Sequence, residues 1–378
     1  MRSRILAISA AALLYGLSTE MAFTQTVHAT DEARVSVTRT VADLSFPWGF
    51  DFLPDGSVLV NEVGGRMWWV TPDGRERIEV AGVPEVRASG QGGLLDLVVD
   101  PDFATTGRVF LTYSEPGRSG AGTTAAHARF VKEGGAARLE DVTVIARMDR
   151  RTGGGRHFGS RVVPAPDGTV FVTTGDRGDP DRAQDPRDHA GKVLRVARDG
   201  TAPADNPFAN GGDGLPEIWS TGHRNIQGAA IDPATGVLWT VEHGARGGDE
   251  INVPQAGLNY GWPVISYGRQ YSGGKIGIGT AAEGYEQPVH YWDPSIAPSG
   301  MTFYAGDAIP AWRGDLFVGA LKDRLISRLE VRDGKVVGEE QMLQGDYGRI
   351  RTLRNAPDGS LWFSTDEPDG ALYRIAAP

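Results

Sequence analysis

The sequence contains no cysteine. This absence excludes disulfide bonds, thiolate ligands for a metal ion and cysteine nucleophiles in one step. If the chain is exported, as its N-terminal segment indicates, the fold has to be held by apolar burial, by closure of the architecture or by a metal ion.

Long apolar segments and clusters of positive charge are also missing. Beyond the N-terminal segment no apolar run approaches the roughly 20 residues of a membrane helix, so no membrane span is expected. The 38 lysines and arginines face 48 aspartates and glutamates, giving a formal net charge of -10. Because no basic cluster could neutralise a phosphate backbone, we expect no nucleic-acid partner.

The N-terminal segment has the pattern of a secretory signal peptide. Two arginines precede an apolar run over residues 5–17, and a polar stretch then ends in Val27-His28-Ala29. The apolar run is too short to span a bilayer, and small residues surround the expected cleavage site. We therefore expect residues 1–29 to be a signal peptide and residues 30–378 to be one periplasmic or secreted domain, as a monomer or weak homodimer.

Glycine and proline are abundant, with 52 and 23 copies, which favours an all-β fold with many short strands and turns. One phrase recurs, in which a proline turn precedes a β-branched or aromatic run. The prolines of its six copies are Pro54, Pro101, Pro166, Pro233, Pro310 and Pro357. This repetition predicts a six-bladed β-propeller, with a β-sandwich of repeated hairpins as the alternative.

The length between copies is greatest around residues 115–160, 177–220 and 250–300. Long connections on a rigid scaffold are where functional sites are usually built, so we expect the site there. The last strand, near residues 371–375, is expected to join N-terminal residues and close the ring.

A histidine flanked by glycines is the first candidate for catalysis. His157 lies in Gly154-Gly-Arg-His-Phe-Gly-Ser-Arg161, where the glycines allow the backbone to approach a ligand. Its ordinary pKa suits a histidine to accept a proton near neutral pH. A hydrogen-bonded loop histidine without catalytic function is the alternative.

Two further segments carry fixed donors and oxygen ligands. Arg224 and Asn225 are adjacent in a loop and could donate to a carbonyl or anionic oxygen, or could simply satisfy loop carbonyls. Residues 242–252, followed by 257–263, combine glycine-rich backbone with carboxylates, as calcium requires. A solvated acidic turn explains the second segment equally well.

Weaker signals come from residues that have ordinary structural explanations. Gln91 lies among glycines before an expected strand, and Lys322 lies beside another. Arg349 and Arg351 alternate on one strand face, which suits a carboxylate-rich ligand or surface salt bridges. The segment 292–300 could wall a pocket or pack in the core.

Taken in order, these segments resemble the soluble quinoprotein sugar dehydrogenases of the glucose/sorbosone dehydrogenase family, most closely the aldose sugar dehydrogenase branch. The resemblance is carried by Gly-Gln-Gly-Gly-Leu-Leu at 90–95, His-Phe-Gly-Ser-Arg at 157–161, Gly-His-Arg-Asn at 222–225, Gly-Asp-Glu-Ile-Asn at 248–252 and Asn-Tyr-Gly-Trp-Pro at 259–263. It implies a six-bladed propeller that binds pyrroloquinoline quinone (PQQ) and calcium.

The resemblance also implies roles for individual residues. His157 is similar to the family's general base, with Gln91 and Arg224 beside the substrate. The implied cofactor contacts are Arg224, Asn225, Lys322, Arg349, Arg351, Ser295, Trp292 and Arg177, the last replacing a glutamine of the glucose-oxidising branch. The implied calcium ligands are the carbonyl oxygens of Gly244 and Ala245, and, at a second site, Glu250 and the Tyr260 carbonyl. Arg156 stands where that branch has an aspartate.

The function implied by the resemblance is oxidation of an aldose at C1 to a lactone by hydride transfer to PQQ, with an external electron acceptor. A calcium-dependent propeller lactonase and a non-enzymatic propeller that binds a sugar or a protein remain the alternatives.

Overall fold

A computed structural model describes residues 25–378 of the protein. The expected signal peptide lies mostly outside the described residues, and its last five residues form the short strand β1 (Gln25–Ala29). In the described part of the chain no helix is long and apolar enough to cross a membrane.

The described residues form an all-β fold of five sheets. The largest sheet contains two consecutive meanders: β3 (Pro47–Phe52), β4 (Val58–Glu62), β5 (Met67–Val70) and β6 (Arg77–Ala81), then β7 (Leu94–Val99), β8 (Arg108–Gly117), β9 (Gly120–Glu133) and β10 (Ala136–Arg147). The only strand pairing between the two meanders is at their outer edges, where β6 and β10 pair in parallel over two residues each. A short helix, α1 (Phe103–Thr106), connects β7 to β8.

Three antiparallel sheets of four strands follow in chain order. They contain β11 (Val162–Pro164), β12 (Thr169–Thr173), β13 (Val193–Ala197) and β14 (Ile218–Ser220); β15 (Ile226–Ile231), β16 (Leu238–Glu242), β17 (Asp249–Asn252) and β18 (His290–Trp292); and β19 (Pro298–Phe303), β20 (Leu316–Ala320), β21 (Ile326–Arg332) and β22 (Lys335–Met342). Two 3-10 helices, η1 (Pro180–Gln184) and η2 (Pro310–Trp312), lie in the connections.

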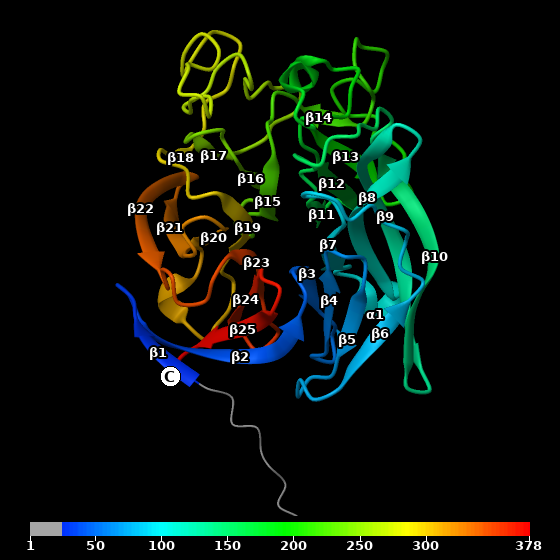
Figure 1. Ribbon diagram of the computed structural model, residues 1–378, viewed down its shortest axis with the longest axis vertical. Helices are drawn as coiled ribbons and strands as arrows, with labels where there is room; N and C mark the ends of the chain where they lie inside the picture. Colours follow the sequence, from blue (N-terminus) through cyan, green and yellow to red (C-terminus); the bar gives the residue numbers. More distant parts are fainter. Residues whose placement is uncertain (1–24) are drawn as a thin grey trace, which may run out of the picture.

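The last sheet joins the two ends of the described chain. It contains β23 (Ile350–Asn355), β24 (Leu361–Thr365) and β25 (Gly370–Ala376), and β2 (Arg34–Leu44) pairs antiparallel with β25. In Figure 1 the red strand β25 lies beside the blue strand β2. The prediction that the last strand pairs with N-terminal residues is therefore confirmed.

The recurring sequence phrase builds the same turn wherever it is complete. Because the glycine takes a left-handed conformation, as Gly168 does at φ 85°, the chain reverses within a few residues. Two backbone hydrogen bonds close each turn. The first runs from the N–H of Leu53, Ala165 or Ala356 to the carbonyl four residues later, at 2.8, 2.9 and 2.8 Å, and the second runs from the turn glycine back to the first residue. Each turn connects the first two strands of a meander.

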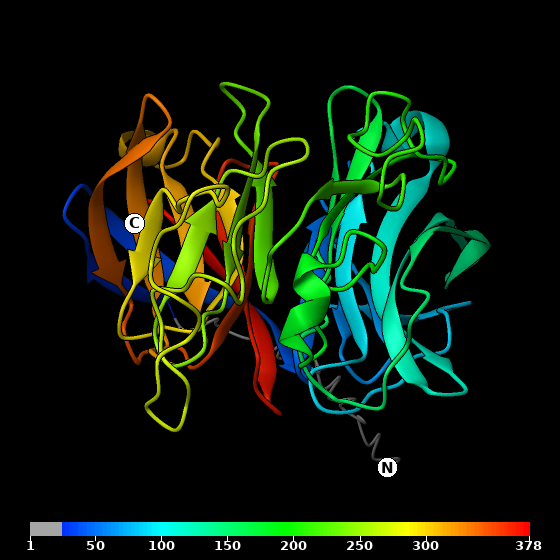
Figure 2. The same cartoon turned by 90° about the horizontal axis from the view of Figure 1, so that it is seen from above.

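These first strands pack around a common centre. In sequence, β3 contacts β7, β7 contacts β11, β11 contacts β15, β15 contacts β19, β19 contacts β23, and β23 contacts β3, so the contacts form a closed cycle. The colours accordingly run around the molecule in Figure 1, and Figure 2 shows the cyan and green sheets on one side and the yellow and orange sheets on the other.

A buried arginine occupies the centre of this cycle. Arg161 is 1% exposed, and its guanidinium donates to Asp96 Oδ1 of β7 at 2.9 Å and to the Gln227 carbonyl of β15 at 2.6 Å. It also donates to Thr352 Oγ1 of β23 at 3.0 Å and lies 4.2 Å from the ring centroid of Trp48 in β3. One cation thus connects the first strands of several sheets.

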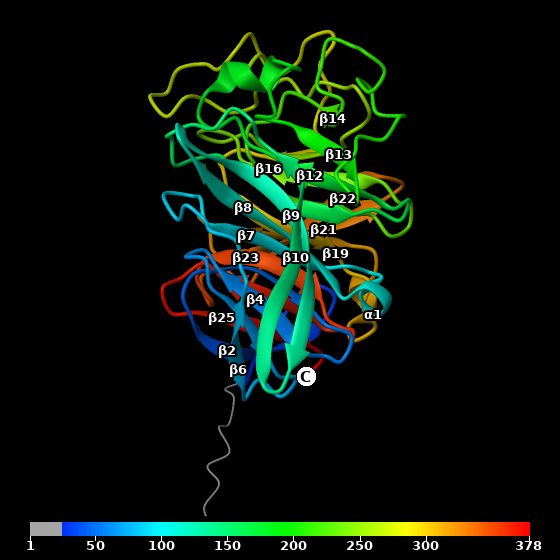
Figure 3. The same cartoon turned by 90° about the vertical axis from the view of Figure 1, so that its right-hand side faces the viewer.

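The long connections divide into strands and loops. In the predicted connection 115–160, residues up to 147 mostly form the long hairpin of β9 and β10, visible in Figure 3, and the loop begins at residue 148. The connections coloured green and yellow, from residues 177–217 and 253–289, gather at one end of the molecule in Figures 1 and 3. The first expected connection is therefore largely β-structure, because its residues pair with each other.

Candidate active site

His157 is held by a carboxylate that sequence analysis did not single out. Its Nδ1–H donates to Asp176 Oδ1 at 2.6 Å, and the Trp262 indole N–H donates to Asp176 Oδ2 at 2.8 Å. Asp176 is fully buried and lies three residues after the end of β12, next to Gly175. The residue before His157 is therefore not needed to orient the imidazole. A Gly-Asp pair at the end of a buried strand was the only sequence signal for it.

The hydrogen bond to Asp176 fixes the protonation pattern of the imidazole. Because a carboxylate accepts the Nδ1–H, the neutral ring carries its lone pair on Nε2. Nε2 has no hydrogen-bond partner among residues 25–378, and His157 lines a cavity of about 440 Å³. The geometry therefore presents a base to this cavity, which we call the histidine cavity.

Burial lowers the pKa of His157 below its ordinary 6.5; Asp176 opposes this shift, whereas Arg224 and Arg156 add to it. The ring is therefore mostly neutral, and competent as a base, at pH 6.5 and above. We expect the ring nitrogen resonances of His157 in an NMR titration to shift at a pH below 6.5. In an Arg156→Ala variant His157 should titrate at a higher pH than in the wild type, because a positive charge beside the imidazole is removed. A midpoint above 6.5 in the wild type would contradict this assignment.

Two amides clamp the loop that carries His157. Gln91 Oε1 accepts a hydrogen bond from the His157 backbone N–H at 2.6 Å, and Asn225 Oδ1 accepts one from the Gly159 N–H at 3.1 Å. These bonds support a strained segment, since His157 has φ 55°. The structure therefore brings both predicted residues to the histidine loop. Gln91 also lines a cavity at the hub, whereas Asn225 is 1% exposed and lines neither that cavity nor the histidine cavity.

Arg177 supports the same loop from within the protein. It is 3% exposed, its guanidinium donates to the carbonyl oxygens of Gly154 and Arg156, and it lies 3.4 Å from the ring centroid of Phe158. Burial lowers its pKa to about 10. Arg177 lines neither the histidine cavity nor the adjacent cavity at the hub. The structure therefore places it as a support of the loop, where sequence analysis expected a cofactor contact.

Arg224 reaches the histidine cavity from the neighbouring sheet. Its Nη1 donates to the His243 carbonyl at 3.1 Å, and its guanidinium lies 5.2 Å from the ring centroid of Trp262. The Nε of Arg224 is buried and has no hydrogen-bond partner among residues 25–378. A buried donor without a partner is unfavourable, so this arginine is suited to an additional acceptor.

A second cavity of about 410 Å³ lies at the hub, and we call it the hub basin. Arg349 and Arg351 line it and share one carboxylate, donating to Asp366 Oδ2 at 3.1 and 2.9 Å. Arg351 also donates to Gln227 Oε1 at 3.1 Å, and its Nε has no partner in the described part of the chain. Two guanidinium groups with one carboxylate leave an excess positive charge, which suits an anionic ligand.

His243 shows that the two cavities are neighbours. It lines the hub basin, and its Nε2–H donates to the Pro298 carbonyl at 2.6 Å. Burial, followed by the charges of Arg224 and Arg351, lowers its pKa to about 3. The charged side chains of both cavities therefore act on a single imidazole. Sequence analysis missed this residue because it lies inside the segment interpreted as calcium-binding.

The remaining residues expected near the cofactor, Trp292, Ser295 and Lys322, separate into two groups. Lys322 Nζ donates to the Ser295 carbonyl at 2.6 Å, and their close sequence neighbours Leu321 and Ala297 line the hub basin. Trp292, in contrast, is 5% exposed and packs in the core, where its indole N–H donates to Glu339 Oε1 at 2.9 Å. It lines no described cavity, so the structure does not bring Trp292 to the site.

The expected calcium ligands surround the same region. Ala245 lines the histidine cavity, while Gly244, Glu250 and Tyr260 line a small adjoining pocket together with Glu242. Burial, followed by the charge of Glu242, raises the pKa of Glu250 to about 8. The buried Glu242 and the half-buried Glu250 in one pocket fit a cation that compensates their charge.

Side chains alone supply few metal ligands. Residues 25–378 contain no group of three or more histidine, aspartate or glutamate side chains arranged to hold a metal ion. A calcium ion beside the histidine cavity would therefore depend on backbone oxygens, as the sequence analysis expected of Gly244 and Ala245. The Gly244 N–H donates to Asp249 Oδ1 at 2.9 Å, and Ser295 Oγ donates to Asp249 Oδ2 at 2.6 Å, which links this turn to the hub-basin rim.

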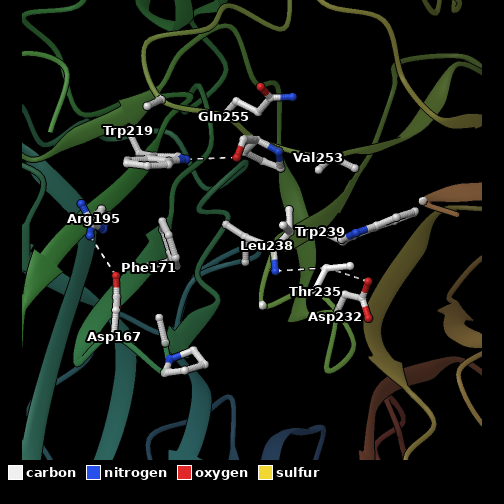
Figure 4. A pocket seen from close by; sticks show the side chains of 17 residues that line it. Asp167, Phe171, Arg195, Trp219, Asp232, Thr235, Leu238, Trp239, Val253 and Gln255 are labelled. Atoms are coloured by element: carbon white, nitrogen blue, oxygen red, sulfur yellow. Dashed lines mark hydrogen bonds and ion pairs between the residues drawn. The ribbon is translucent and has the colours of Figure 1, made fainter. Parts of the chain in front are cut away.

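The largest cavity, of about 760 Å³, shares no residue with the site. Figure 4 shows its aromatic walls, Phe171 and Trp219. Arg195 contacts Asp167 at 2.9 Å, and the Trp219 indole donates to the Pro254 carbonyl at 3.0 Å. Among the described residues this outer groove has no buried arginine nitrogen without a partner, whereas the hub basin has the Nε of Arg351.

Comparisons of the sequence and of the structure with known proteins indicate the same family. The model of the Glucose / Sorbosone dehydrogenase family matches residues 44–374. The aldose sugar dehydrogenase of Escherichia coli (strain K12) is 42% identical over 349 residues, covering 91% of this chain and 93% of that protein. The crystal structure of the soluble aldose sugar dehydrogenase from Escherichia coli in the apo-form is similar with a TM-score of 0.87 at 40% identity, covering 91% of this chain and 100% of that one. The PQQ-bound form of aldose sugar dehydrogenase from Streptomyces coelicolor is similar with a TM-score of 0.75 at 26% identity, covering 92% and 99%.

Proposed function

Because the chain belongs to the glucose/sorbosone dehydrogenase family, we propose that it is an exported quinoprotein that oxidises aldose sugars at C1 to lactones. The observation that carries this proposal is the pairing of an oriented base with an adjacent cationic basin. His157 is held by Asp176 in one cavity, and Arg349 and Arg351 line the next. The relatives named above as aldose sugar dehydrogenases support the substrate class.

We also infer that the ring has six blades. This count treats the two meanders of the eight-stranded sheet as separate blades, because they share only the short parallel pairing at their edges. The cyclic contacts among β3, β7, β11, β15, β19 and β23 support it. Residues 30–378 are then one domain, since each blade packs on the next around a common hub.

The residues of the hub basin fit PQQ by their chemistry. Arg349, Arg351 and Lys322 are the cations available to its carboxylates, and the partnerless Nε atoms of Arg224 and Arg351 offer further donors. The backbone oxygens of Gly244 and Ala245 would hold calcium beside it, and Glu250 with the Tyr260 carbonyl would hold a second calcium ion. When bound, PQQ and calcium supply a hydride acceptor with a polarised carbonyl.

The protein's own residues supply the proton chemistry. Oxidation at C1 requires the C1 hydroxyl proton to leave as C1 gives up a hydride, and His157 Nε2 is placed to accept that proton. Asp176 stabilises the imidazolium that forms, because its carboxylate already accepts the Nδ1–H. Arg224 lines the same cavity and can stabilise negative charge that develops on an oxygen beside it.

The alternatives make different demands on the site. A metal-dependent lactonase needs several side-chain carboxylates or amides on an axial metal ion, and residues 25–378 contain no such carboxylate and histidine group. A binding propeller without enzymatic function needs no oriented base, yet the hydrogen bond from His157 to Asp176 and the clamp from Gln91 maintain one.

Reconstitution separates the three functions. The apoprotein is incubated with PQQ and calcium, and reduction of an artificial electron acceptor is followed with a panel of aldoses. We expect aldose-dependent reduction that requires both additions and is lost after chelation and dialysis. Hydrolysis of a lactone without PQQ would support the lactonase instead, and sugar binding without turnover in either assay would support the non-enzymatic propeller.

The cationic pair gives a prediction for cofactor affinity. An Arg349→Gln variant should bind PQQ roughly 10- to 100-fold more weakly, because a charged hydrogen bond is worth about 1.5–3 kcal/mol. Titration of the apoprotein with PQQ, followed by quenching of tryptophan fluorescence, measures the dissociation constant. Arg187→Gln is the matched control, since Arg187 pairs with Asp213 on the surface and lines no described cavity. Equal affinity of Arg349→Gln and the wild type would remove Arg349 from the cofactor site.

A further inference from the structure

A hairpin at the edge of the histidine cavity carries unusually exposed apolar side chains. Tyr271 is 71% exposed and Ile278 is 65% exposed, the two highest values among large apolar residues of the described chain. Both belong to the segment 266–279. Large apolar side chains that remain in water on a built element often mark a contact surface for a ligand.

Backbone hydrogen bonds hold the hairpin at its tip and at its base. At its tip the Gln270 N–H donates to the Gly274 carbonyl and the Gly273 N–H to the Gln270 carbonyl, both at 2.8 Å. At its base Arg246 and Arg269 exchange two backbone hydrogen bonds, at 2.9 and 3.0 Å. Tyr271 therefore sits at the tip of an ordered support rather than on a free loop.

The tip reaches the cavity of the base. Gln270 and Tyr271 line the histidine cavity together with His157 and Trp262. An exposed tyrosine ring at the edge of this cavity is suited to the apolar C–H face of a sugar, because stacking removes apolar surface from water and leaves the phenol hydroxyl free.

We propose that Tyr271 is a specificity-determining contact for the sugar, stacking on the part of the aldose remote from C1. The inference rests on the proposed function, because His157 has to meet the C1 hydroxyl in the same cavity. A contact remote from the reacting atoms is the same in the ground state and the transition state. It therefore changes KM and leaves kcat unaltered.

Substitution at the hairpin tip tests this contact in the reconstituted holoenzyme. Tyr271→Ala should raise KM for an aldose roughly three- to tenfold, the size expected for one aromatic contact, with kcat unchanged. Tyr271→Phe should stay close to the wild type, because the ring is retained. Val337→Ala is the control: Val337 is also an exposed apolar residue, at 58%, but it lies on β22 and lines no described cavity. Circular dichroism checks that each variant is folded.

A binding measurement provides a readout independent of turnover. Calorimetric titration of the holoenzyme with 1,5-anhydro-D-glucitol, a sugar without the C1 hydroxyl, should give a dissociation constant that is weaker in Tyr271→Ala by the same factor as KM. If the wild type oxidises aldoses while Tyr271→Ala keeps both constants, the Tyr271 inference is overturned and the proposed function stands. If the wild type neither oxidises nor binds any sugar, both are overturned.

Discussion

Replacement of His157 by alanine is expected to lower kcat by about 10²- to 10⁴-fold in the reconstituted enzyme, the contribution typical of a general base. The imidazole is the only group in the histidine cavity that is oriented by a buried carboxylate and has a free lone pair. Affinity for PQQ should stay close to that of the wild type, because the cations of the hub basin are unchanged. Stopped-flow reduction with a saturating aldose and a separate PQQ titration measure the two effects.

Two further variants test whether the decrease in kcat comes from the loss of the general base. Asp176→Asn should also lower kcat strongly, because an amide can hold the imidazole in the tautomer that places the proton on Nε2. His127→Ala should have little effect, since His127 lies on β9 and lines neither cavity. Turnover retained in His157→Ala would remove this histidine from the mechanism, whatever the result for Asp176→Asn.

The second large effect concerns stability. Arg161→Met should lower the free energy of unfolding by about 3–5 kcal/mol, the cost of removing one partner from a buried ion pair. Asp96 would keep its contact to Arg354 at 3.1 Å but lose the buried cation at 2.9 Å, and carbonyls at the hub would lose a donor. Urea unfolding followed by tryptophan fluorescence and circular dichroism measures the change.

Arg354→Met is the matched control for this experiment. Arg354 donates to the same Asp96 oxygen, but its side chain is 17% exposed, against 1% for Arg161, and contacts fewer sheets. Its loss should therefore destabilise the protein less. If the free energy of unfolding of Arg161→Met lies within about 1 kcal/mol of the wild-type value, the arginine does not stabilise the hub. Substitutions on the surface change the free energy of unfolding by no more than that.

The sequence predicted those features that depend on local pattern. The proline and glycine turns form hairpins because their conformational preferences act within a few residues, and β25 pairs with β2 as expected. The glycine-flanked His157 and the alternating Arg349 and Arg351 line adjacent cavities for a similar reason. The conformation of such short motifs in loops and on strand faces is determined mainly by the residues of the motif itself.

Features that depend on contacts between sheets could not be read from the sequence. Asp176 meets His157 and Trp262 only because three separate segments converge, and no spacing rule connects them. Trp292 points into the core because it lies on strand β18, where alternate side chains face opposite sides, whereas Ser295 lies beyond the strand at the rim. We expected Arg177 to contact the cofactor, but its guanidinium is buried and donates hydrogen bonds to loop carbonyls instead.

The pairing of β2 with β25 also governs when the architecture can be completed. The sheet that contains residues 34–44 needs residues 370–376 as a partner, so a ribosome has to synthesise β25 before the ring can close. The timing of assembly therefore follows from the distance in the sequence between the two paired strands.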